Sequence, residues 1–424
     1  MEHKVFARYP LGNPRRVWRQ DNFILSTFSA VGQNMRGILQ TCADAGFNLI
    51  ETGGATHEQA EEAIRICEEL QLDLILQDNS LYGGMQKRQM DRAQLSASDA
   101  RQICDRIRPW RHVIGYYIWD EPYGEGQLER ARRETDLFQF ADPTRVPFNV
   151  AIPSYNDKFT WQNGEFADYL DRYCRIIDPA ILSLDYYPIG LSSYTDEGQL
   201  DNSFMWLDLG LMRNLGRTYA MPVWFYYQGM NLYRYHRFTF PMVRMNMYSA
   251  VLYGAKGLQQ FKALYSTVKQ DGTPDVFFDD QRQIHREFKM LGGTLMALEN
   301  VNVIHSDDLL PGCEHMAGLA ETMADSRHLV GTLPNRVSIG EFEDAYGNQY
   351  LLVLNRDYET DAAITLDLKE NCRIYEVSRI TGKQNVIWDE TRQINVSLAK
   401  GDAILYRIQP AAEEAFTVEY RLEK

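Results

Sequence analysis

Two adjacent acidic residues, Asp120 and Glu121, follow directly on an apolar stretch of the chain. The preceding residues, 113–119, are mainly β-branched and aromatic, which is the composition of a buried strand. Pro122 has no backbone N–H to donate to a sheet, so it marks the end of that strand. Carboxylates in such surroundings are costly unless the protein uses them. They therefore either cap the next helix or take part in chemistry.

Proton transfer is the chemistry that suits Glu121. An apolar surround raises the pKa of a carboxyl group, and a neighbouring carboxylate raises it further. We expect Trp119 to share its side of the strand with Glu121, and Asp120 is adjacent in the chain. The pattern therefore predicts that Glu121 stays protonated and acts as the general acid of a glycoside cleavage, in which the acid protonates the leaving oxygen.

The elements around this strand repeat in a regular order. Short apolar runs alternate with segments whose apolar residues recur at helical spacing. Strict strand–helix alternation, eight times over about 240 residues, predicts an α/β fold of the (β/α)8 barrel type, a TIM barrel. A doubly wound sheet is the alternative, but it requires a glycine-rich phosphate loop after the first strand, and segment 26–34 is not one. The predicted strands are 23–29, 49–52, 72–77, 113–119, 146–152, 181–187, 223–227 and 256–261.

Polar and aromatic side chains stand at the ends of most of these strands. The strand ends and following loops of a barrel converge on one rim, so residues far apart in the sequence meet there. Carboxylates ringed by flat apolar faces suit a sugar, whose ring stacks by its C–H face while its hydroxyls bind acceptors. We interpret Arg244 as a structural residue. The predicted substrate-binding residues are Glu51, Asp78, Tyr123, Tyr155, Trp161, Asp185, Tyr187, Trp224, Gln228 and Lys262.

A different pattern begins after residue 302. Apolar residues now alternate with period two, as Ile364, Leu366 and Leu368 do, and turn residues separate the runs. This pattern predicts a small antiparallel β-sandwich. We therefore divide the chain into a catalytic barrel, residues 1–302, and a C-terminal β-sandwich domain, residues 303–424.

The composition excludes several classes of partner. The chain has 58 acidic against 44 basic residues, a net charge of −14, whereas nucleic acids and anionic membranes require a basic face. A neutral carbohydrate substrate is compatible with this charge, and so is the formation of a homo-oligomer. No group of His, Asp and Glu has metal-ligand spacing and the six cysteines form no CxxC pair, so we expect no metal and no other cofactor.

The N-terminal segment bears on the location of the protein. It lacks the apolar core and the small-residue cleavage site of a signal peptide, and no run is apolar enough over sufficient length to span a membrane. We therefore expect a cytoplasmic protein as the sequence stands, or an exported one if a leader has been removed.

Three further stretches, together with residues 113–122, resemble segments of a known family. They are SLDYYPI (183–189), PVWFYYQG (222–229) and RMNMYSAVLYGAKGLQQF (244–261). In this order, the four stretches resemble the clan A glycoside hydrolases, most of all relatives of the family 42 β-galactosidases. The resemblance covers nearly the whole barrel. It implies a (β/α)8 fold and an acid/base glutamate at the end of the fourth strand, which corresponds to Glu121.

Two residues depart from the pattern of that family. The family usually has Asn before the acid/base glutamate, where this chain has Asp120. It also has a nucleophilic glutamate at the end of the seventh strand, where this chain has Gln228, either native or substituted for a glutamate. An amide cannot form the glycosyl ester of a retaining enzyme. The usual two-carboxylate retaining mechanism is therefore not expected.

Two mechanisms and two non-catalytic functions remain open. The Asp–Glu pair is similar to glycoside hydrolase family 123, which acts on N-acetylhexosaminides. That resemblance implies that Asp120 steadies the acetamido group of the substrate as it attacks, while Glu121 protonates the leaving group. Alternatively, Asp185 or Glu51 activates a water in an inverting reaction. Gln228 also suits a carbohydrate-binding barrel of weak or no activity, and the sandwich is a second candidate for the binding module.

Overall fold

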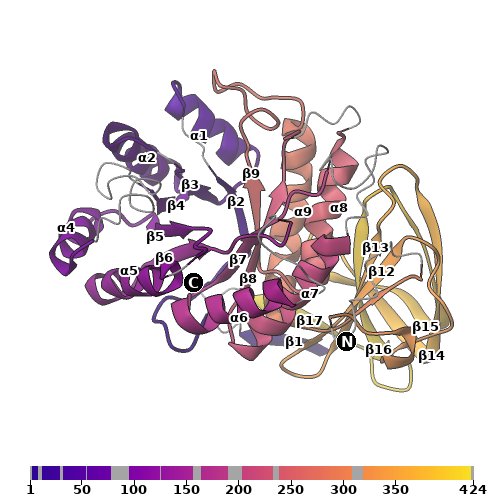
Figure 1. Ribbon diagram of the computed structural model, residues 1–424. Coiled ribbons are helices and arrows are strands. Elements are labelled where there is room, and N and C mark those ends of the chain that lie inside the picture. Colours follow the sequence, from indigo (N-terminus) through magenta and orange to yellow (C-terminus); the bar gives the residue numbers. More distant parts are fainter. Residues whose placement is uncertain are drawn as a thin grey trace.

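The computed structural model describes residues 2–7, 12–28, 32–53, 55–77, 95–124, 126–155, 164–189, 203–232, 238–307 and 319–421. Two of the predicted binding residues, Asp78 and Trp161, lie outside these ranges. Figure 1 shows a barrel of strands and helices beside a second, purely β part. The barrel strands are β2 (Ile24–Phe28), β3 (Leu49–Glu51), β4 (Asp73–Leu76), β5 (Val113–Asp120), β6 (Val146–Val150), β7 (Leu182–Asp185), β8 (Val223–Gln228) and β9 (Gly257–Phe261).

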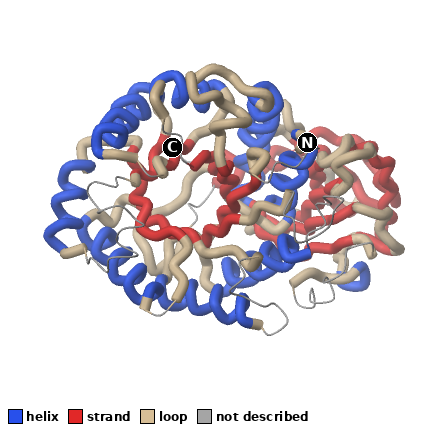
Figure 2. The backbone as a smooth tube through the Cα atoms, turned by 45° about the horizontal axis from the view of Figure 1, so that its top comes forward, coloured by secondary structure: helices blue, strands red, loops and turns tan. Residues whose placement is uncertain are grey.

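These eight strands are parallel and form a closed ring. Their order is β6-β5-β4-β3-β2-β9-β8-β7. The ring closes between β6 and β7, where the Ala151 N–H donates to Ser183 O at 2.8 Å and Ala151 bridges Leu184. Figure 2 shows the ring of strands within a layer of helices. The predicted (β/α)8 barrel is therefore confirmed.

Helices follow the strands and cover the outside of the ring. Two of them begin at capping boxes, with Thr56 and Gln59 at the start of α2 and Ser96 and Asp99 at the start of α4. Such boxes satisfy backbone N–H groups that have no partner within the helix. The helices are α1 (Met35–Asp44), α2 (His57–Leu70), α4 (Ala97–Ile107), α5 (Gln127–Ala141), α6 (Glu165–Ile177), α7 (Ser203–Thr218), α8 (Phe240–Leu252) and α9 (Phe278–Ala297).

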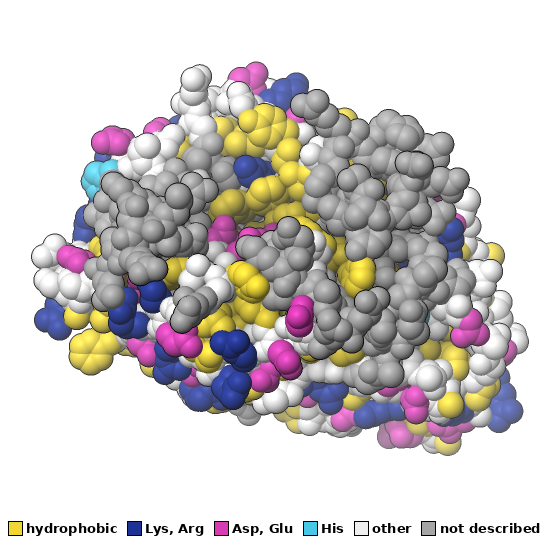
Figure 3. Space-filling view, in the orientation of Figure 1, with side chains coloured by type: hydrophobic (Ala, Val, Ile, Leu, Met, Phe, Trp, Pro, Cys, Tyr) yellow, Lys and Arg dark blue, Asp and Glu magenta, His cyan; other side chains and the backbone are white. Residues whose placement is uncertain are grey.

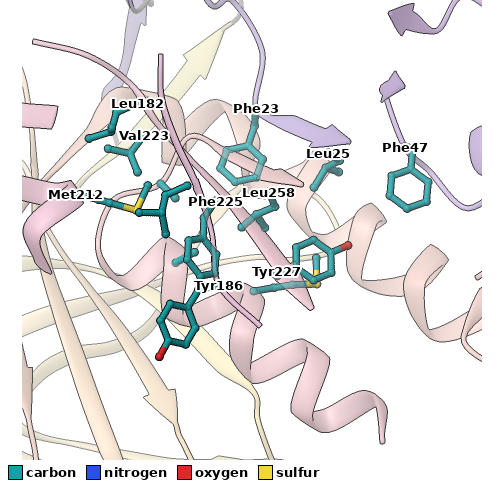
Figure 4. Close-up of a cluster of buried hydrophobic side chains, with 14 of the residues drawn as sticks. Phe23, Leu25, Phe47, Leu182, Tyr186, Met212, Val223, Phe225, Tyr227 and Leu258 are labelled. Carbon is teal, nitrogen blue, oxygen red and sulfur yellow. The ribbon is translucent and has the colours of Figure 1, made fainter. Parts of the chain in front are cut away.

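Alternate residues of each strand belong to two separate cores. In β8, Val223, Phe225 and Tyr227 pack against the helices, and Figure 4 shows part of this outer layer. Trp224 and Tyr226 point the other way, into the barrel interior, where they join apolar residues of β2 to β6. This period of two follows from the strand geometry, and it decides which side chains reach the interior of the barrel.

The C-terminal part is an antiparallel β-domain. Its sheet has the strand order β10-β12-β13-β16-β14-β11, with β15 paired to β14, and it encloses its own apolar core. The predicted β-sandwich is confirmed. Its strand β10 spans the boundary predicted at 302/303. The strands are β10 (Leu298–His305), β11 (Leu329–Val330), β12 (Val337–Asp344), β13 (Gln349–Asn355), β14 (Ala362–Val377), β15 (Gln384–Leu398) and β16 (Ala403–Pro410).

Two features join this domain to the barrel. β1 (Glu2–Ala7) pairs in parallel with β17 (Phe416–Arg421), so the two ends of the described chain lie together. Arg244 of α8 donates to Asp402, which precedes β16, from Nε at 2.9 Å and from Nη2 at 2.6 Å. This contact agrees with the structural role expected for Arg244. Within the described ranges, no helix combines the length and the apolar character needed to cross a membrane.

Candidate active site

A β-bulge at the end of β5 sets the direction of the acidic pair. Tyr117 pairs with Phe148 of β6, but the next pair is Trp119 with Asn149, so Ile118 is the extra residue. Trp119 consequently faces the helices, where its Nε1 donates to Glu134 of α5 at 2.9 Å. The expectation that Trp119 lines the same side as Glu121 is therefore wrong. Bulges commonly occur beside active sites, where they redirect side chains.

The same bulge turns Asp120 into the barrel. Its Oδ1 accepts a hydrogen bond from the Tyr117 hydroxyl at 3.0 Å. Burial raises the pKa of Asp120 above its ordinary value, and the bond from Tyr117 opposes that rise. Tyr117 is thus the donor that holds Asp120 in place.

Glu121 adopts a backbone conformation that is rare for its residue type. Its φ is +47°, in the left-handed region that residues other than glycine seldom occupy. The Glu121 N–H donates to Val150 O at 3.0 Å, which ties it to the end of β6. Strained residues of this kind cluster at functional sites. Glu121 is half-buried, as Asp120 is, whereas Glu51 and Asp185 are buried in the barrel interior.

Glu51 lies at the centre of a buried polar network. Its carboxylate accepts hydrogen bonds from Ser26 Oγ at 2.6 Å, from Gln259 Nε2 at 2.8 Å and from the Tyr226 hydroxyl. Burial raises the pKa of Glu51, the three donors lower it, and the charge of Asp120 raises it again, with a net rise. Three donors occupy the carboxylate, so Glu51 acts as a fixed part of the barrel interior.

Asp185, at the end of β7, completes the group of acids. Burial, and then the charges of Glu121 and Asp120, raise the pKa of Asp185 well above its ordinary value, although Tyr187 donates a hydrogen bond to it. Within the described part of the chain, Asp185 Oδ1 has no hydrogen-bond partner. Each charged carboxylate disfavours ionisation of its neighbours in an apolar interior. The Asp185 carboxyl therefore holds its proton to a higher pH than an isolated carboxyl group does.

Aromatic rings form a wall beside the acids. Phe28 ends β2 and Phe261 ends β9, and their rings stack with centroids 5.8 Å apart. Tyr187 also stacks with Phe261, with ring centroids 4.8 Å apart. Figure 3 shows a hollow in this face of the molecule, where acidic side chains lie among hydrophobic ones. Flat rings beside carboxylates match the surface that a sugar requires.

Gln228 ends β8 inside the barrel, but its amide is committed to the backbone. Its Oε1 accepts from the Ile189 N–H at 2.7 Å, and its Nε2 donates to Ile189 O at 2.9 Å and to Met230 O at 3.2 Å. Donor and acceptor atoms are both used in the correct sense, as a glutamine requires. This pairing places Gln228 in the support of the site.

The remaining predicted residues divide into two groups. Tyr155 packs edge-on against Tyr186 at 4.9 Å and Tyr123 against Tyr169 at 6.2 Å, both in loops beside the acids. Lys262 follows Phe261 directly, with Nζ 5.0 Å from the centre of that ring. Trp224, however, is fully buried in the barrel interior, deeper than the residues at the strand ends.

The deeper position of Trp224 overturns its assignment to the rim. Its Nε1 donates to Gln20 at 2.8 Å, and its ring meets Trp18 edge-on at 6.2 Å. A methyl group on Gly257 would lie 2.6 Å from the indole, so the neighbouring strand has glycine where the ring passes. Trp224 fills the barrel interior, since it lies two residues before Tyr226 on the same face of β8.

Several residues of the site were not foreseen. Ser26, Gln259 and Ser183 form a polar layer, in which Ser183 Oγ donates to Gln259 Oε1 at 2.8 Å. Polar residues inside otherwise apolar strands were the available signal, because the interior of a buried strand rarely holds them without a partner. Within the described ranges, no three His, Cys, Asp or Glu side chains are grouped as a metal site.

Comparisons with known proteins bear on the fold. No protein-family model matches the sequence, and no curated protein matches it. Among solved structures, the chain is similar to a catalytic mutant of a family 42 β-galactosidase from G. stearothermophilus, with a TM-score of 0.54, 10% identity and coverage of 95% of this chain and 99% of that one. It is also similar to a putative α-galactosidase from Bacteroides fragilis, with a TM-score of 0.51, 11% identity and coverage of 92% and 79%.

At this identity the likeness concerns architecture alone. Both proteins match over most of this chain, so the likeness extends beyond the barrel into the β-domain. The chain thus has a TIM-barrel fold with a C-terminal β-domain, in an arrangement that it shares with proteins described as glycosidases.

Proposed function

We propose that this protein is a glycosidase with Glu121 as its general acid. The observation that supports this most is the convergence of Glu121, Asp120 and Asp185 at the carboxyl ends of β5 and β7, where each charge acts on the Asp185 carboxyl. Burial and the repulsion between neighbouring carboxylates both favour the protonated form of such groups. A glycosidic oxygen needs such a proton to leave.

Glu121 is the member of the group that suits contact with a substrate. Glu51 is fully buried and accepts three hydrogen bonds, and Asp185 is almost fully buried. Glu121 and Asp120 are both half-buried. Asp120 already accepts a hydrogen bond from Tyr117, whereas Glu121 follows the end of β5 with a left-handed backbone. We therefore assign proton donation to Glu121. Asp185 interacts electrostatically with Glu121 and Asp120 from its buried position.

Two groups are candidates for the attack on the anomeric carbon. In the first route, the carbonyl oxygen of a 2-acetamido group on the substrate forms the new bond as the glycosidic C–O bond breaks. Asp120 then orients the amide N–H, Glu121 gives its proton to the leaving oxygen, and water opens the cyclic intermediate. Because Gln228 cannot act as a nucleophile, this route supplies one from the substrate.

In the second route, Asp185 removes a proton from water as that water attacks, and the configuration at the anomeric carbon inverts. This route requires the two carboxyl groups to lie about 6.5–9.5 Å apart, so that a water fits between them. The influence of the Glu121 charge on the Asp185 pKa supports this pairing. Asp185 accepts a proton only when it is ionised, so its raised pKa predicts that this reaction needs a higher pH than a reaction with an ordinary carboxylate base.

The first experiment replaces Glu121 by Gln and measures hydrolysis of aryl and alkyl glycosides, including N-acetylhexosaminides. We expect kcat/KM to fall about 10²–10⁴-fold for alkyl glycosides, and much less for 2,4-dinitrophenyl glycosides, whose leaving group needs no proton. Glu129→Gln is the matched control, because Glu129 is exposed on α5. Equal losses for both kinds of leaving group would exclude Glu121 as the general acid.

A second experiment separates the two routes. Asp120→Asn should abolish cleavage of N-acetylhexosaminides in the first route, with retention of the anomeric configuration in the wild-type product. Asp185→Asn should abolish activity in the second route, with inversion. Proton NMR of the first-formed product reads the configuration directly.

A carbohydrate-binding protein without activity is the second candidate, because Gln228 replaces the nucleophile and is bound to the backbone. It predicts binding of oligosaccharides in calorimetry with no product after long incubation, and any hydrolysis that depends on Glu121 would reject it.

A further inference from the structure

The loop between β9 and α9 is built into the top of the barrel. Gln260, fully buried, donates from Nε2 to Ser266 Oγ at 3.0 Å and to Thr267 Oγ1 at 3.1 Å. Ser266, Thr267 and Val268 are themselves buried, as are the two residues before Tyr265. The loop thus has a fixed course at the same end of the barrel as the acids.

Tyr265 is the exception within this buried segment. Its side chain is 55% exposed, and its φ is +74°. The left-handed conformation costs roughly 1–2 kcal/mol for a residue with a side chain, and an exposed ring recovers little of it by burial. Glycine or asparagine would fit this backbone better. Neither local conformation nor packing therefore explains an aromatic residue here.

The ring of Tyr265 is also held in place. Its N–H donates to Val268 O at 3.0 Å, and its hydroxyl accepts from Gln270 Nε2 at 2.6 Å. A ring whose backbone and hydroxyl are both hydrogen-bonded loses less entropy when a ligand packs on it than an unattached ring does. These contacts are those of a preorganised surface.

The position of Tyr265 relates it to the site. Phe261 belongs to the aromatic wall, Lys262 follows it with its ammonium over the ring, and Tyr265 is three residues further on. In Figure 3, hydrophobic side chains continue from the acids in the hollow toward its upper edge. Aromatic faces at successive depths match the successive sugar units of a chain.

We propose that Tyr265 is a stacking platform for a second or later sugar unit, which makes an oligosaccharide the ligand of this site. The proposal deepens the proposed function and rests on it. Lys262, whose ammonium lies over the Phe261 ring of the aromatic wall, supplies hydrogen bonds to hydroxyl groups. The acidic group beneath repels acidic sugars, so the oligosaccharide is neutral.

The test uses the full chain with Glu121→Gln, which prevents turnover, on an array of neutral oligosaccharides from disaccharides upward, N-acetylated ones included. Bound oligosaccharides are then titrated by calorimetry against Glu121→Gln with Tyr265→Ala and against Glu121→Gln with Tyr265→Phe. We expect the alanine variant to bind about tenfold more weakly, the loss of one aromatic stacking contact. The phenylalanine variant keeps the ring and should bind as the parent does.

Two outcomes would overturn the proposal. One is an unchanged affinity in the alanine variant, and the other is no binding to any oligosaccharide of the array. A thermal unfolding curve for each variant verifies its fold, and Tyr265→Ala should unfold at or near the parent temperature because the ring is exposed. If the platform is confirmed but the wild-type chain releases no product from the bound oligosaccharides, the catalytic proposal fails while the platform stands.

Discussion

The side-chain amide of Gln228 forms two hydrogen bonds with the backbone of Ile189, one as acceptor and one as donor. Oε1 accepts the Ile189 N–H at 2.7 Å and Nε2 donates to the Ile189 carbonyl at 2.9 Å. The amide thereby joins the segments that follow β7 and β8, directly beneath the mouth of the barrel. The resemblance assigns covalent chemistry to this position. In this chain, the side chain instead connects the end of β8 to the segment after β7 by hydrogen bonds.

This pairing predicts the effect of restoring a glutamate. In Gln228→Glu, one carboxylate oxygen would face the carbonyls of Ile189 and Met230, and two donated hydrogen bonds would be lost. A buried group left without its partner costs about 1–3 kcal/mol, so we expect a loss of this size in urea unfolding and no gain in hydrolysis. Gln102→Glu, exposed on α4, is the control. A rise in kcat would contradict the structural role.

Much of the fold was accessible from the sequence. The predicted strands 146–152 and 181–187 contain β6 (Val146–Val150) and β7 (Leu182–Asp185), because turn residues bound these apolar runs on both sides. The capping pair Thr56 and Gln59 is likewise visible in the sequence, since it depends on spacing within a few residues. Local signals of this kind need no knowledge of the neighbouring strand.

The details of the site depended on contacts between strands, which the sequence does not display. Residues 117–119 are all apolar, so nothing in them reveals that the register with β6 slips there and sends Trp119 outward. Trp224 and Tyr226 share one face of β8, yet only the depth of each within the barrel decides that the second reaches Glu51. The partner of Gln228 is a backbone, which leaves no trace in residue types.

The hydroxyl of Tyr117 should tune the titration of Asp120. The bond that it donates opposes the rise in the Asp120 pKa that burial causes. In Tyr117→Phe the pKa rises further, so the ionised form that orients a substrate amide appears only at higher pH. We expect the acid limb of the kcat/KM profile to move to higher pH, with a loss of about 1 kcal/mol in stability.

Tyr116 supplies a matched control for this change. It is the preceding residue of β5 and faces the helices, where its hydroxyl donates to Asp142 at 3.1 Å. Tyr116→Phe should cost a similar amount of stability and leave the pH profile of activity in place. A profile that shifts equally in both variants would show that Tyr117 acts only through the stability of β5.

Asp185 should make the protein less stable as the pH rises. Its pKa in the folded chain lies well above the value of about 3.9 in an unfolded chain. Between these two values the unfolded chain releases its proton first, so the free energy of unfolding falls with rising pH across that interval. Asp185→Asn removes this dependence, although Asp120 and Glu51 retain their own.

We therefore expect Asp185→Asn to be more stable than the wild type at pH 8 by about 0.5–2 kcal/mol, the usual gain from a stabilising substitution. At pH 4 the two proteins should be nearly equal in stability. Unfolding in urea at the two pH values measures the difference. Asp307→Asn, an exposed residue whose environment is the solvent, should show no such trend. Equal stabilities of Asp185→Asn and wild type at pH 8 would contradict the raised pKa.

The contact between the barrel and the C-terminal domain should depend on Asp402. This carboxylate accepts from Arg244 at 2.6 Å and from Arg379 at 2.7 Å, and all three side chains are largely buried. Burial opposes the charge of Asp402, but the two guanidinium groups outweigh it and hold its pKa below the ordinary value. The stabilisation is thus fully present above about pH 4 and is lost as the pH falls through the lowered pKa.

Because Asp402→Asn leaves two buried cations with one fewer partner, we expect a loss of about 3–5 kcal/mol at neutral pH. Asp389→Asn breaks the Arg373 pair, whose carboxylate is 81% exposed, and should cost less than about 1 kcal/mol. Similar losses in the two variants, measured by urea unfolding, would show that the domains are held together by their apolar contacts instead.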